Sequence, residues 1–351
     1  MGFEEKIRRV TPYVPGEQPK EADIIKLNTN ENPYPPSPKV EKAIRDFDAD
    51  SLRLYPDPAS SVLVEALAKR YGLKEDEVFV GVGSDDVLAM CFLTFFNSDK
   101  PVVFPDITYS FYDVWAELFR IPYKQIPLDE NFRIVPGDYA GGAGGVIFPN
   151  PNAPTGALMP LEEIRGIVRA NQDCVVIVDE AYIDFGGETA LPLIREFGNV
   201  AVVQTFSKSR SAAGLRIGYC FANPKLIRAL NDVKYSFNSY TMNRLTIVAG
   251  AAAIEDEEYF RSSCAKICAT RERITKALRE TGFVLNDSAA NFVFASHPDV
   301  PAGDIFKYLK TRKIYVRWWD KPRIRNHLRI TIGTDEQMDV LIRALKDFLT
   351  P

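Results

Sequence analysis

Histidine is nearly absent from this chain of 351 residues, in which it occurs only as His297 and His327. Two histidines exclude a histidine-rich metal site, and a Ser-His-Asp triad would have to use one of them. Cysteine is also scarce, and its five positions are Cys91, Cys174, Cys220, Cys264 and Cys268. Because this number is odd and no C-x-x-C pair occurs, we expect free thiols in a reducing cytoplasm and no metal site.

Long apolar runs and a strong excess of charge are absent as well. The longest mainly apolar run covers residues 87–96, whereas a membrane-spanning helix takes about 20 residues. Residues 1–6 carry no apolar signal core, so we expect a cytoplasmic protein without a membrane anchor. The net charge of -4 gives no electrostatic reason to expect nucleic acid or an anionic membrane as a partner. An anionic ligand must therefore be held by a local cluster of cations.

Helical and strand patterns alternate along most of the chain, which predicts an α/β fold. Seven short apolar strands are expected at 78–82, 101–104, 123–126, 146–148, 175–178, 200–204 and 217–221. Helical patterns are expected at 39–47, 61–71, 84–97, 109–119, 161–170 and 224–231. Seven strands with intervening helices favour a mostly parallel seven-stranded sheet that is covered by helices on both faces.

The pattern changes near residue 255, where a long charged amphipathic helix is predicted over 256–281. Further strands are expected at 283–285, 291–295, 314–317 and 327–332, a helix lies among them, and a last helix is expected at 335–349. The length suggests about two domains. We expect residues 1–30 to be an irregular N-terminal arm, 31–255 a large domain and 256–351 a smaller α+β C-terminal domain.

Lys208 is surrounded by small and hydroxylated residues, and Arg216 follows eight positions later. Small neighbours allow a bulky group to approach the lysine amine, while hydroxyls and an arginine suit a phosphate. Pyridoxal 5'-phosphate (PLP) meets both descriptions, because its aldehyde condenses with a lysine amine to form a Schiff base. A surface turn rich in Ser, Arg and Lys is the plain alternative.

Asp179 ends a predicted buried strand, and Tyr182 follows three residues later. A carboxylate is costly to bury without a partner. A protonated pyridine nitrogen would be such a partner, and Tyr182 could then reach the phenolic oxygen of the same ring. A helix cap or a magnesium ligand is the alternative role for Asp179.

A glycine turn at Gly83 and Ser84 leads from a predicted strand into a helix, where backbone amides hold a phosphate well. The side chain of Asp85 would repel a phosphate, so only its backbone amide can serve one. The turn resembles part of a dinucleotide-binding fingerprint, but Val87 stands near the place of the third glycine. A nicotinamide-dependent dehydrogenase is therefore a remote alternative.

Four more residues are candidates because they end or follow strands. Tyr109 could stack on a planar ring, with core packing as the alternative. The proline-rich loop 150–156 contains Asn152 and is expected to be rigid. Arg317 and Arg329 could clamp an anionic substrate with paired hydrogen bonds, although strand arginines often only extend to solvent.

Together these residues resemble the fold-type I, class II PLP-dependent aminotransferases. The segments that carry the resemblance are 27–34, 55–56, 83–85, 105–109, 154–156, 179–182, 207–208, 216 and 328–334. They extend over essentially the whole chain, and the resemblance implies the fold of that family, with a large PLP-binding domain and a smaller C-terminal domain.

The resemblance also implies roles around the cofactor ring. Lys208 is expected to hold PLP as a Schiff base and to act as the general base of the reaction. Asp179 is expected to pair with the pyridine nitrogen, Tyr182 to bond the phenolic oxygen and Tyr109 to stack on the ring. The family's loop has an asparagine for the phenolic oxygen where this chain has Ala153. Asn152 is the candidate to replace it, although successive side chains point in different directions.

The resemblance further implies which residues bind phosphate and substrate. Those expected to hold the cofactor phosphate are Gly83, Ser84, Asp85, Ser207 and Arg216. Tyr55 is expected to reach the phosphate of a neighbouring subunit, which implies a homodimer with shared active sites. Those expected to contact substrate are Tyr13, Asn30 and Arg317, with Arg329 at its anionic end.

The resemblance is closest to members that act on L-histidinol phosphate. It implies amino transfer to 2-oxoglutarate, with imidazole-acetol phosphate and L-glutamate as products, in histidine biosynthesis. Aromatic or aspartate aminotransferase and threonine-phosphate decarboxylase remain alternatives of the same fold, and the last shares a phosphate-bearing substrate. A catalytically silent PLP-binding regulator is disfavoured, because no DNA-binding segment is appended.

Overall fold

The structure is a computed structural model that describes residues 2–349. Its central sheet has seven strands in the order β2-β8-β7-β6-β5-β3-β4. These strands are β2 (Val78–Gly81), β3 (Val102–Pro105), β4 (Tyr123–Ile126), β5 (Gly145–Pro149), β6 (Val176–Asp179), β7 (Val200–Thr205) and β8 (Gly218–Ala222). Only β8 runs antiparallel to its neighbours β2 and β7, so the predicted, mostly parallel seven-stranded sheet is confirmed.

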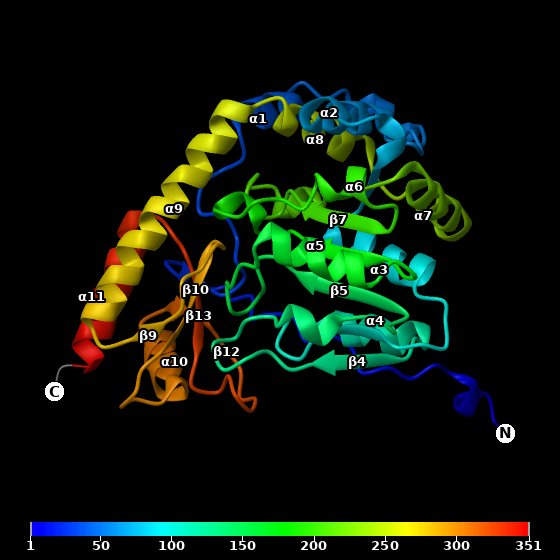
Figure 1. Cartoon of the computed structure of the whole chain (residues 1–351). Coiled ribbons are helices and arrows are strands. Elements are labelled where there is room, and N and C mark those ends of the chain that lie inside the picture. The colour runs from blue at the N-terminus through cyan, green and yellow to red at the C-terminus, as the bar shows by residue number, and fades with distance from the viewer. Residues whose placement is uncertain (1, 350–351) are drawn as a thin grey trace.

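The sheet is buried between two layers of helices, because alternate side chains of each strand enter different hydrophobic clusters. The helices of this part of the chain are α1 (Pro38–Arg45), α2 (Ser61–Tyr71), α3 (Ser84–Phe95), α4 (Tyr112–Phe119), α5 (Leu161–Ala170), α6 (Leu193–Glu196), α7 (Pro224–Phe237) and α8 (Arg244–Ile254) (Figure 1). In β5, Val146 and Phe148 pack in one cluster with side chains of α2, α5 and α8, whereas Ile147 packs in the other with side chains of α3, α4 and α7.

Helix α8 was not predicted from the sequence. Its residues 249–251 and 253–254 are buried, and most are alanine. Its exposed residue Val248 is apolar as well, so the helix has no polar face and lacks the amphipathic period that identifies a surface helix. Within residues 2–349 there are also six short 3-10 helices, at Phe3–Lys6, Ala49–Arg53, Glu75–Glu77, Pro136–Tyr139, Ile183–Phe185 and Ala213–Leu215.

A second, four-stranded sheet follows the long helix α9 (Glu257–Glu280). Its strand order is β12-β13-β10-β9, and all of its pairs are antiparallel. The elements are β9 (Val284–Leu285), β10 (Phe292–Ser296), α10 (Ala302–Thr311), β12 (Arg317–Trp318), β13 (Leu328–Thr331) and α11 (Asp335–Leu349). Helices α9 and α11 lie against each other beside this sheet, at the left of Figure 1. The single strand expected at 314–317 is divided into β11 (Ile314–Tyr315) and β12.

The end of the predicted arm, residues 24–30, is packed, which corrects the expectation that the whole of residues 1–30 is an irregular segment. Strand β1 (Ile25–Lys26) pairs in parallel with β11. Leu27 and Asn30 are almost fully buried, and the amide of Thr331 donates to the carbonyl oxygen of Leu27 at 3.0 Å. The arm is ordered here because its backbone groups find partners in the C-terminal part of the chain.

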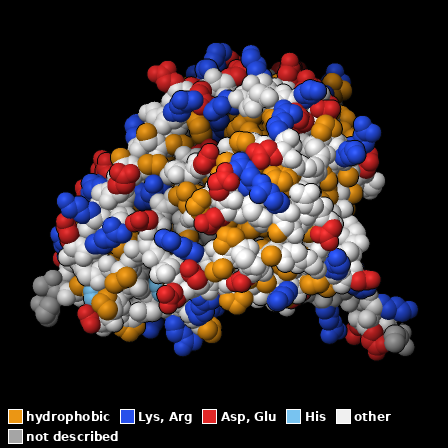
Figure 2. Space-filling view, in the orientation of Figure 1, with side chains coloured by type: hydrophobic (Ala, Val, Ile, Leu, Met, Phe, Trp, Pro, Cys, Tyr) orange, Lys and Arg blue, Asp and Glu red, His pale blue; other side chains and the backbone are white. Residues whose placement is uncertain are grey.

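The visible surface carries charges of both signs, intermingled over the face shown in Figure 2. Within residues 2–349, no helix is both long enough and apolar enough to cross a membrane.

Candidate active site

The carboxyl ends of three parallel strands meet at one cavity of about 180 Å³, which we call the inner chamber. Pro149 ends β5, Asp179 ends β6 and Thr205 ends β7, and all three line the cavity. Because the strands are parallel and in register, the residues that follow them gather at the same edge of the sheet.

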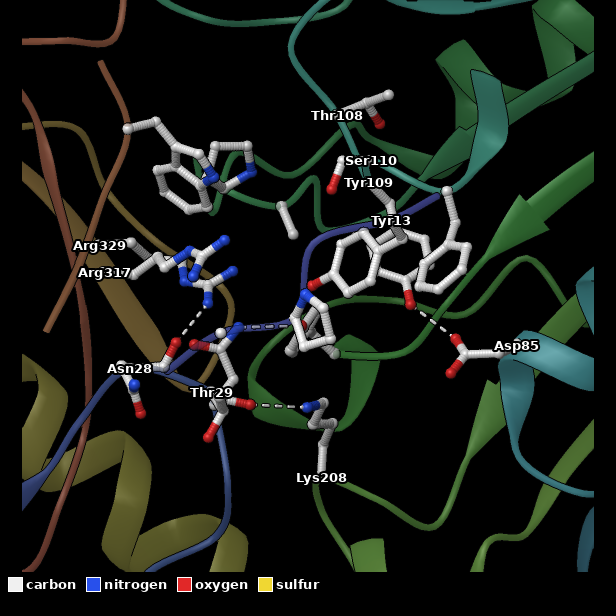
Figure 3. Close-up of a pocket in the computed structure, with 18 of the residues that line it drawn as sticks. Tyr13, Asn28, Thr29, Asp85, Thr108, Tyr109, Ser110, Lys208, Arg317 and Arg329 are labelled. Carbon is white, nitrogen blue, oxygen red and sulfur yellow. Dashed lines mark hydrogen bonds between the residues drawn. The ribbon is translucent and has the colours of Figure 1, made fainter. Parts of the chain in front are cut away.

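A second cavity of about 330 Å³, the outer chamber, adjoins the inner one. Residues that line both are Thr29, Asp85, Tyr109, Ala153, Tyr182, Lys208 and Arg216. Figure 3 shows Arg317 and Arg329 side by side on one flank of the outer chamber, with Asp85 on the opposite flank. The arm, the large sheet and the small sheet all contribute to its walls, so the chamber forms only when these parts are folded together.

Lys208 lies where the two chambers join, and its Nζ donates to the carbonyl oxygen of Thr29 at 3.1 Å (Figure 3). Burial lowers the pKa of Lys208 from 10.5 to about 8, and the positive charge of Arg329 adds to this effect. A lysine with this pKa supplies the neutral, nucleophilic amine near neutral pH.

Asp179 is almost fully buried, and its partners are neutral donors. The hydroxyl of Tyr112 donates to Oδ2 at 2.7 Å, and the amide of Ala181 donates to Oδ1 at 3.3 Å. Burial raises the pKa of Asp179 from 3.8 to about 6, although the bond from Tyr112 opposes the shift. A buried carboxylate in this setting would be stabilised by a cationic ligand placed beside it.

Tyr182 and Asn30 form a buried pair on the wall between the chambers. The Nδ2 of Asn30 donates to the hydroxyl of Tyr182 at 2.9 Å, and the hydroxyl of Thr331 donates to Oδ1 of Asn30 at 3.0 Å. Burial raises the pKa of Tyr182, so its hydroxyl remains protonated and can donate to an oxygen in the inner chamber. Asn30 lines the outer chamber as expected, but part of its amide is engaged with Tyr182.

The turn before α3 brings an arginine and a helix N-terminus together. Gly83 has φ +88°, and a Cβ at this position would lie 2.5 Å from Nη2 of Arg216. Only glycine therefore allows the guanidinium to lie against this turn. Ser84 begins α3 and lines the inner chamber, where free backbone amides of a helix start attract an anion.

Ser207 and Asp85, which are also expected to hold the cofactor phosphate, line the inner chamber, and their role there stays a prediction. Ser207 lines the inner chamber and accepts a hydrogen bond from Thr205 at 3.0 Å. The carboxylate of Asp85 accepts from the hydroxyl of Tyr109 at 2.6 Å and pairs with Arg216 at 3.4 Å. Arg216 is thus already held at the chamber by the carboxylate of Asp85.

The two candidate substrate arginines lie together in the outer chamber. Nη2 of Arg329 donates to the carbonyl oxygen of Asn28 at 2.8 Å, while its Nε has no hydrogen-bond partner among the described residues. Burial lowers the pKa of Arg329, and the charge of Arg317 contributes to the shift. Tyr13 lines the same chamber and stacks on Phe111 with a centroid distance of 4.2 Å.

The structure does not support Asn152 as a cofactor contact. Its Nδ2 donates to the carbonyl oxygen of Ile107 and the hydroxyl of Thr155, and its Oδ1 accepts from Thr108. These bonds hold the loop in its own conformation and engage both hydrogens of Nδ2. The neighbouring Ala153, in contrast, lines both chambers. The expected substitution of Asn152 for the missing asparagine is therefore wrong.

Tyr55 is not near either chamber of its own chain. Its side chain is 77% exposed and stacks on Tyr240 with a centroid distance of 4.7 Å. The expected contact between Tyr55 and a phosphate requires a second subunit and stays a prediction.

Several residues of the site were not identified from the sequence. Tyr112 holds Asp179, and its position three residues after Tyr109 was the available signal. Asn32 donates from Nδ2 to the carbonyl oxygen of Lys208 at 3.0 Å, so the segment just after the arm supports the lysine loop directly. Trp319 lines the outer chamber and carried no sequence signal beyond its aromatic ring.

The chain is similar to known proteins along almost its whole length. The model of the family described as aminotransferase class I and II matches residues 22–345. The histidinol-phosphate aminotransferase of Aromatoleum aromaticum is 54% identical over 347 residues, which cover 98% of each chain. That of Lactococcus lactis subsp. cremoris (strain MG1363) is 51% identical over 349 residues, covering 99% of this chain and 98% of that protein. The crystal structure of histidinol-phosphate aminotransferase from Sinorhizobium meliloti in complex with pyridoxal-5'-phosphate matches with a TM-score of 0.85 and 27% identity, covering 93% of this chain and 90% of that chain.

Replacing Lys208 with methionine is expected to raise the free energy of unfolding of the ligand-free protein at about pH 7 by about 1–3 kcal/mol. Because folding lowers the pKa of Lys208 from 10.5 to about 8, the unfolded chain binds more protons between these pH values. The wild-type free energy of unfolding therefore rises with pH across this window, and the advantage of Lys208→Met shrinks. Urea denaturation at about pH 7 and about pH 10 measures both values.

Lys276→Met on the exposed side of α9 is the matched control, and it should change the free energy of unfolding little at either pH. An advantage of Lys208→Met that stays constant or grows with pH would contradict the buried-amine explanation.

Proposed function

The chain belongs to the aminotransferase class I and II family, and we propose that it transfers the amino group of L-histidinol phosphate to 2-oxoglutarate with PLP as cofactor. The products are imidazole-acetol phosphate and L-glutamate, and the reaction belongs to histidine biosynthesis. One observation carries the proposal: Lys208 and Asp179 face the same inner chamber, and that chamber opens toward the arginine pair of the outer one.

The residues of the inner chamber fit PLP group by group. Lys208 offers an amine of lowered pKa to the aldehyde, and the carboxylate of Asp179 has only neutral partners and is suited to a ring N–H cation. The Gly83 turn, which a Cβ would fill, brings Arg216 to the start of α3 and suits the phosphate. When bound, the cofactor supplies an electron sink for the charge that develops at the reacting carbon of the substrate.

Lys208 is positioned to move the proton. Its Nζ, once neutral, would act as general base: it would accept a proton from the substrate carbon and give that proton to the cofactor carbon. A pKa of about 8 leaves a useful fraction of neutral amine near neutral pH, and it keeps the conjugate acid strong enough to give the proton back. Asn32 fixes the backbone of Lys208 through the carbonyl oxygen and so limits where Nζ can reach.

Asp179 stabilises positive charge at the bottom of the inner chamber. The hydroxyl of Tyr112 and the amide of Ala181 orient its two carboxylate oxygens. A ring N–H cation next to Asp179 would lower its pKa again, since an opposite charge favours the ionised carboxylate. The hydroxyl of Tyr182, held by Asn30, would be available to bond the phenolic oxygen of the ring.

The outer chamber selects an anionic substrate. Arg317 and Arg329 line it without a carboxylate partner among residues 2–349, so they can bind the phosphate of L-histidinol phosphate or a carboxylate of 2-oxoglutarate in turn. Tyr13, stacked on Phe111, forms a wall of this chamber and helps to exclude water from the bound substrate.

A homodimer is part of the proposal. The surface around Tyr55 exposes several large apolar side chains, which are those of Leu52, Leu54, Tyr55, Phe237 and Tyr240. A patch of this kind marks an interaction surface. A second copy that covers it would bring Tyr55 to the phosphate end of its partner's inner chamber.

The direct test of the reaction is a panel of amino donors with 2-oxoglutarate as acceptor. We expect kcat/KM for L-histidinol phosphate to exceed that for phenylalanine, tyrosine and aspartate by roughly 100-fold or more, because the two charges of its phosphate pair with both arginines, whereas the α-carboxylate of these amino acids carries one charge. Threonine phosphate should release no carbon dioxide. Stopped or coupled assays of glutamate and a carbon dioxide electrode provide the readouts.

Lys208→Ala should abolish transfer, while Lys276→Ala, on the exposed face of α9, should retain it. Preferred use of an aromatic donor, or release of carbon dioxide from threonine phosphate, would assign the enzyme to one of the same-fold alternatives instead.

Tyr55→Phe is expected to weaken PLP binding by the dimer about tenfold, because one hydroxyl bond to a charged phosphate is lost. Equilibrium dialysis of PLP against the purified dimer measures this. Tyr240→Phe removes the hydroxyl of the ring stacked on Tyr55 and should leave the affinity unchanged. Equal PLP affinity in wild type and Tyr55→Phe would remove Tyr55 from the site.

A further inference from the structure

Trp319 is shared by the two arginines of the outer chamber. The guanidinium carbon of Arg317 lies 5.1 Å from the centroid of the Trp319 ring, and that of Arg329 lies 5.2 Å from it. Both distances are within the range of about 6 Å in which a cation is attracted to an aromatic face, and tryptophan gives the strongest such attraction. One indole ring therefore contacts both cations.

The arginine pair needs such a contact because its charges are poorly compensated. The two cations lie side by side (Figure 3), and Asp85 is the one carboxylate among the described residues that line the outer chamber. Asp85 lies on the opposite flank and is engaged by Tyr109 and Arg216. Like charges held close together repel each other, and the aromatic face reduces the cost of keeping them there.

Trp319 also packs against hydrophobic side chains. It packs on a small hydrophobic cluster that includes Ile107 and Leu128 from the loops of the large sheet and Phe294 from β10. It also lines a separate cavity of about 270 Å³ beyond the outer chamber, so the ring divides two spaces. A ring fixed by packing in this way can hold flexible arginine side chains in one place.

We propose that Trp319 is a positioning residue that keeps Arg317 and Arg329 together as a pair and thereby favours a dianionic phosphate over a monoanionic carboxylate. A carboxylate can use its two oxygens on a single guanidinium, whereas a phosphate has three terminal oxygens and two charges and engages both arginines at once. This inference deepens the proposed function and rests on it for the identity of the phosphate-bearing donor.

The test compares Trp319→Leu, which keeps an apolar side chain without an aromatic face, with Trp319→Phe, which keeps a smaller face. Trp318→Leu is the matched control, because Trp318 packs on Phe306 and bonds the carbonyl oxygen of Arg325 without lining the outer chamber. Isothermal calorimetry measures binding of inorganic phosphate to each PLP-loaded enzyme at constant ionic strength. Steady-state assays measure KM and kcat for L-histidinol phosphate and KM for 2-oxoglutarate.

Trp319→Leu is expected to weaken inorganic phosphate binding about tenfold and Trp319→Phe about threefold, since two cation–aromatic contacts are lost or reduced. KM for L-histidinol phosphate should rise in the same order with kcat changed less than about twofold, and KM for 2-oxoglutarate should rise less. Trp318→Leu should leave phosphate affinity and both KM values unchanged. If Trp319→Leu does not fold, the Trp319→Phe and Trp318→Phe pair gives the same comparison.

Unchanged phosphate affinity in the Trp319 variants would overturn the inference, as would equal losses in Trp319→Leu and Trp319→Phe, which would point to ring volume instead of the aromatic face. A wild type that binds no phosphate would overturn it too. If the wild type binds phosphate but does not turn over L-histidinol phosphate, the proposed function fails, and the ordered loss of phosphate affinity still decides the role of Trp319.

Discussion

Buried Asp179 and partly buried Lys208 face one cavity without a direct bond between them, and the rest of the structure depends on this constraint. Asp179 has only hydroxyl and amide donors, and Lys208 donates to a backbone carbonyl oxygen. Burial raises the pKa of the acid to about 6 and lowers that of the amine to about 8. Both shifts mean that burial disfavours the charged forms of the acid and the amine, so burying these two groups lowers the free energy of unfolding until a ligand supplies partners for them. The same two groups are the ones that the proposed reaction uses.

The fold maintains this arrangement by bringing three separate parts of the chain to the same edge. The parallel strands place Asp179 and the lysine loop at their carboxyl ends, as open α/β sheets generally do. The arm contributes Thr29 to the lysine, the segment just after the arm contributes Asn32, and the small sheet contributes Arg317 and Arg329 to the outer chamber. Because each part is anchored by the others, the distance between the reacting amine and the anion site is set by tertiary packing.

Much of the fold could be predicted from the sequence, because buried parallel strands are short apolar runs with a clear boundary at their polar ends. For the same reason Asp179 and Lys208 were identifiable: an acid at a strand end and a lysine among small residues each have few ordinary explanations. Helix α8 was missed because it has no polar face. Asn152 was misassigned because a single loop residue gives no information about which way its side chain turns. The position of Tyr55 depends on a second chain and could not be tested within one.

A crystal structure of the PLP-bound protein tests the central claim most directly. It should show continuous electron density between Nζ of Lys208 and the cofactor, with the ring nitrogen within about 2.6–3.2 Å of a carboxylate oxygen of Asp179. A cofactor bound outside the inner chamber, or a ring whose nitrogen faces away from Asp179, would contradict the account.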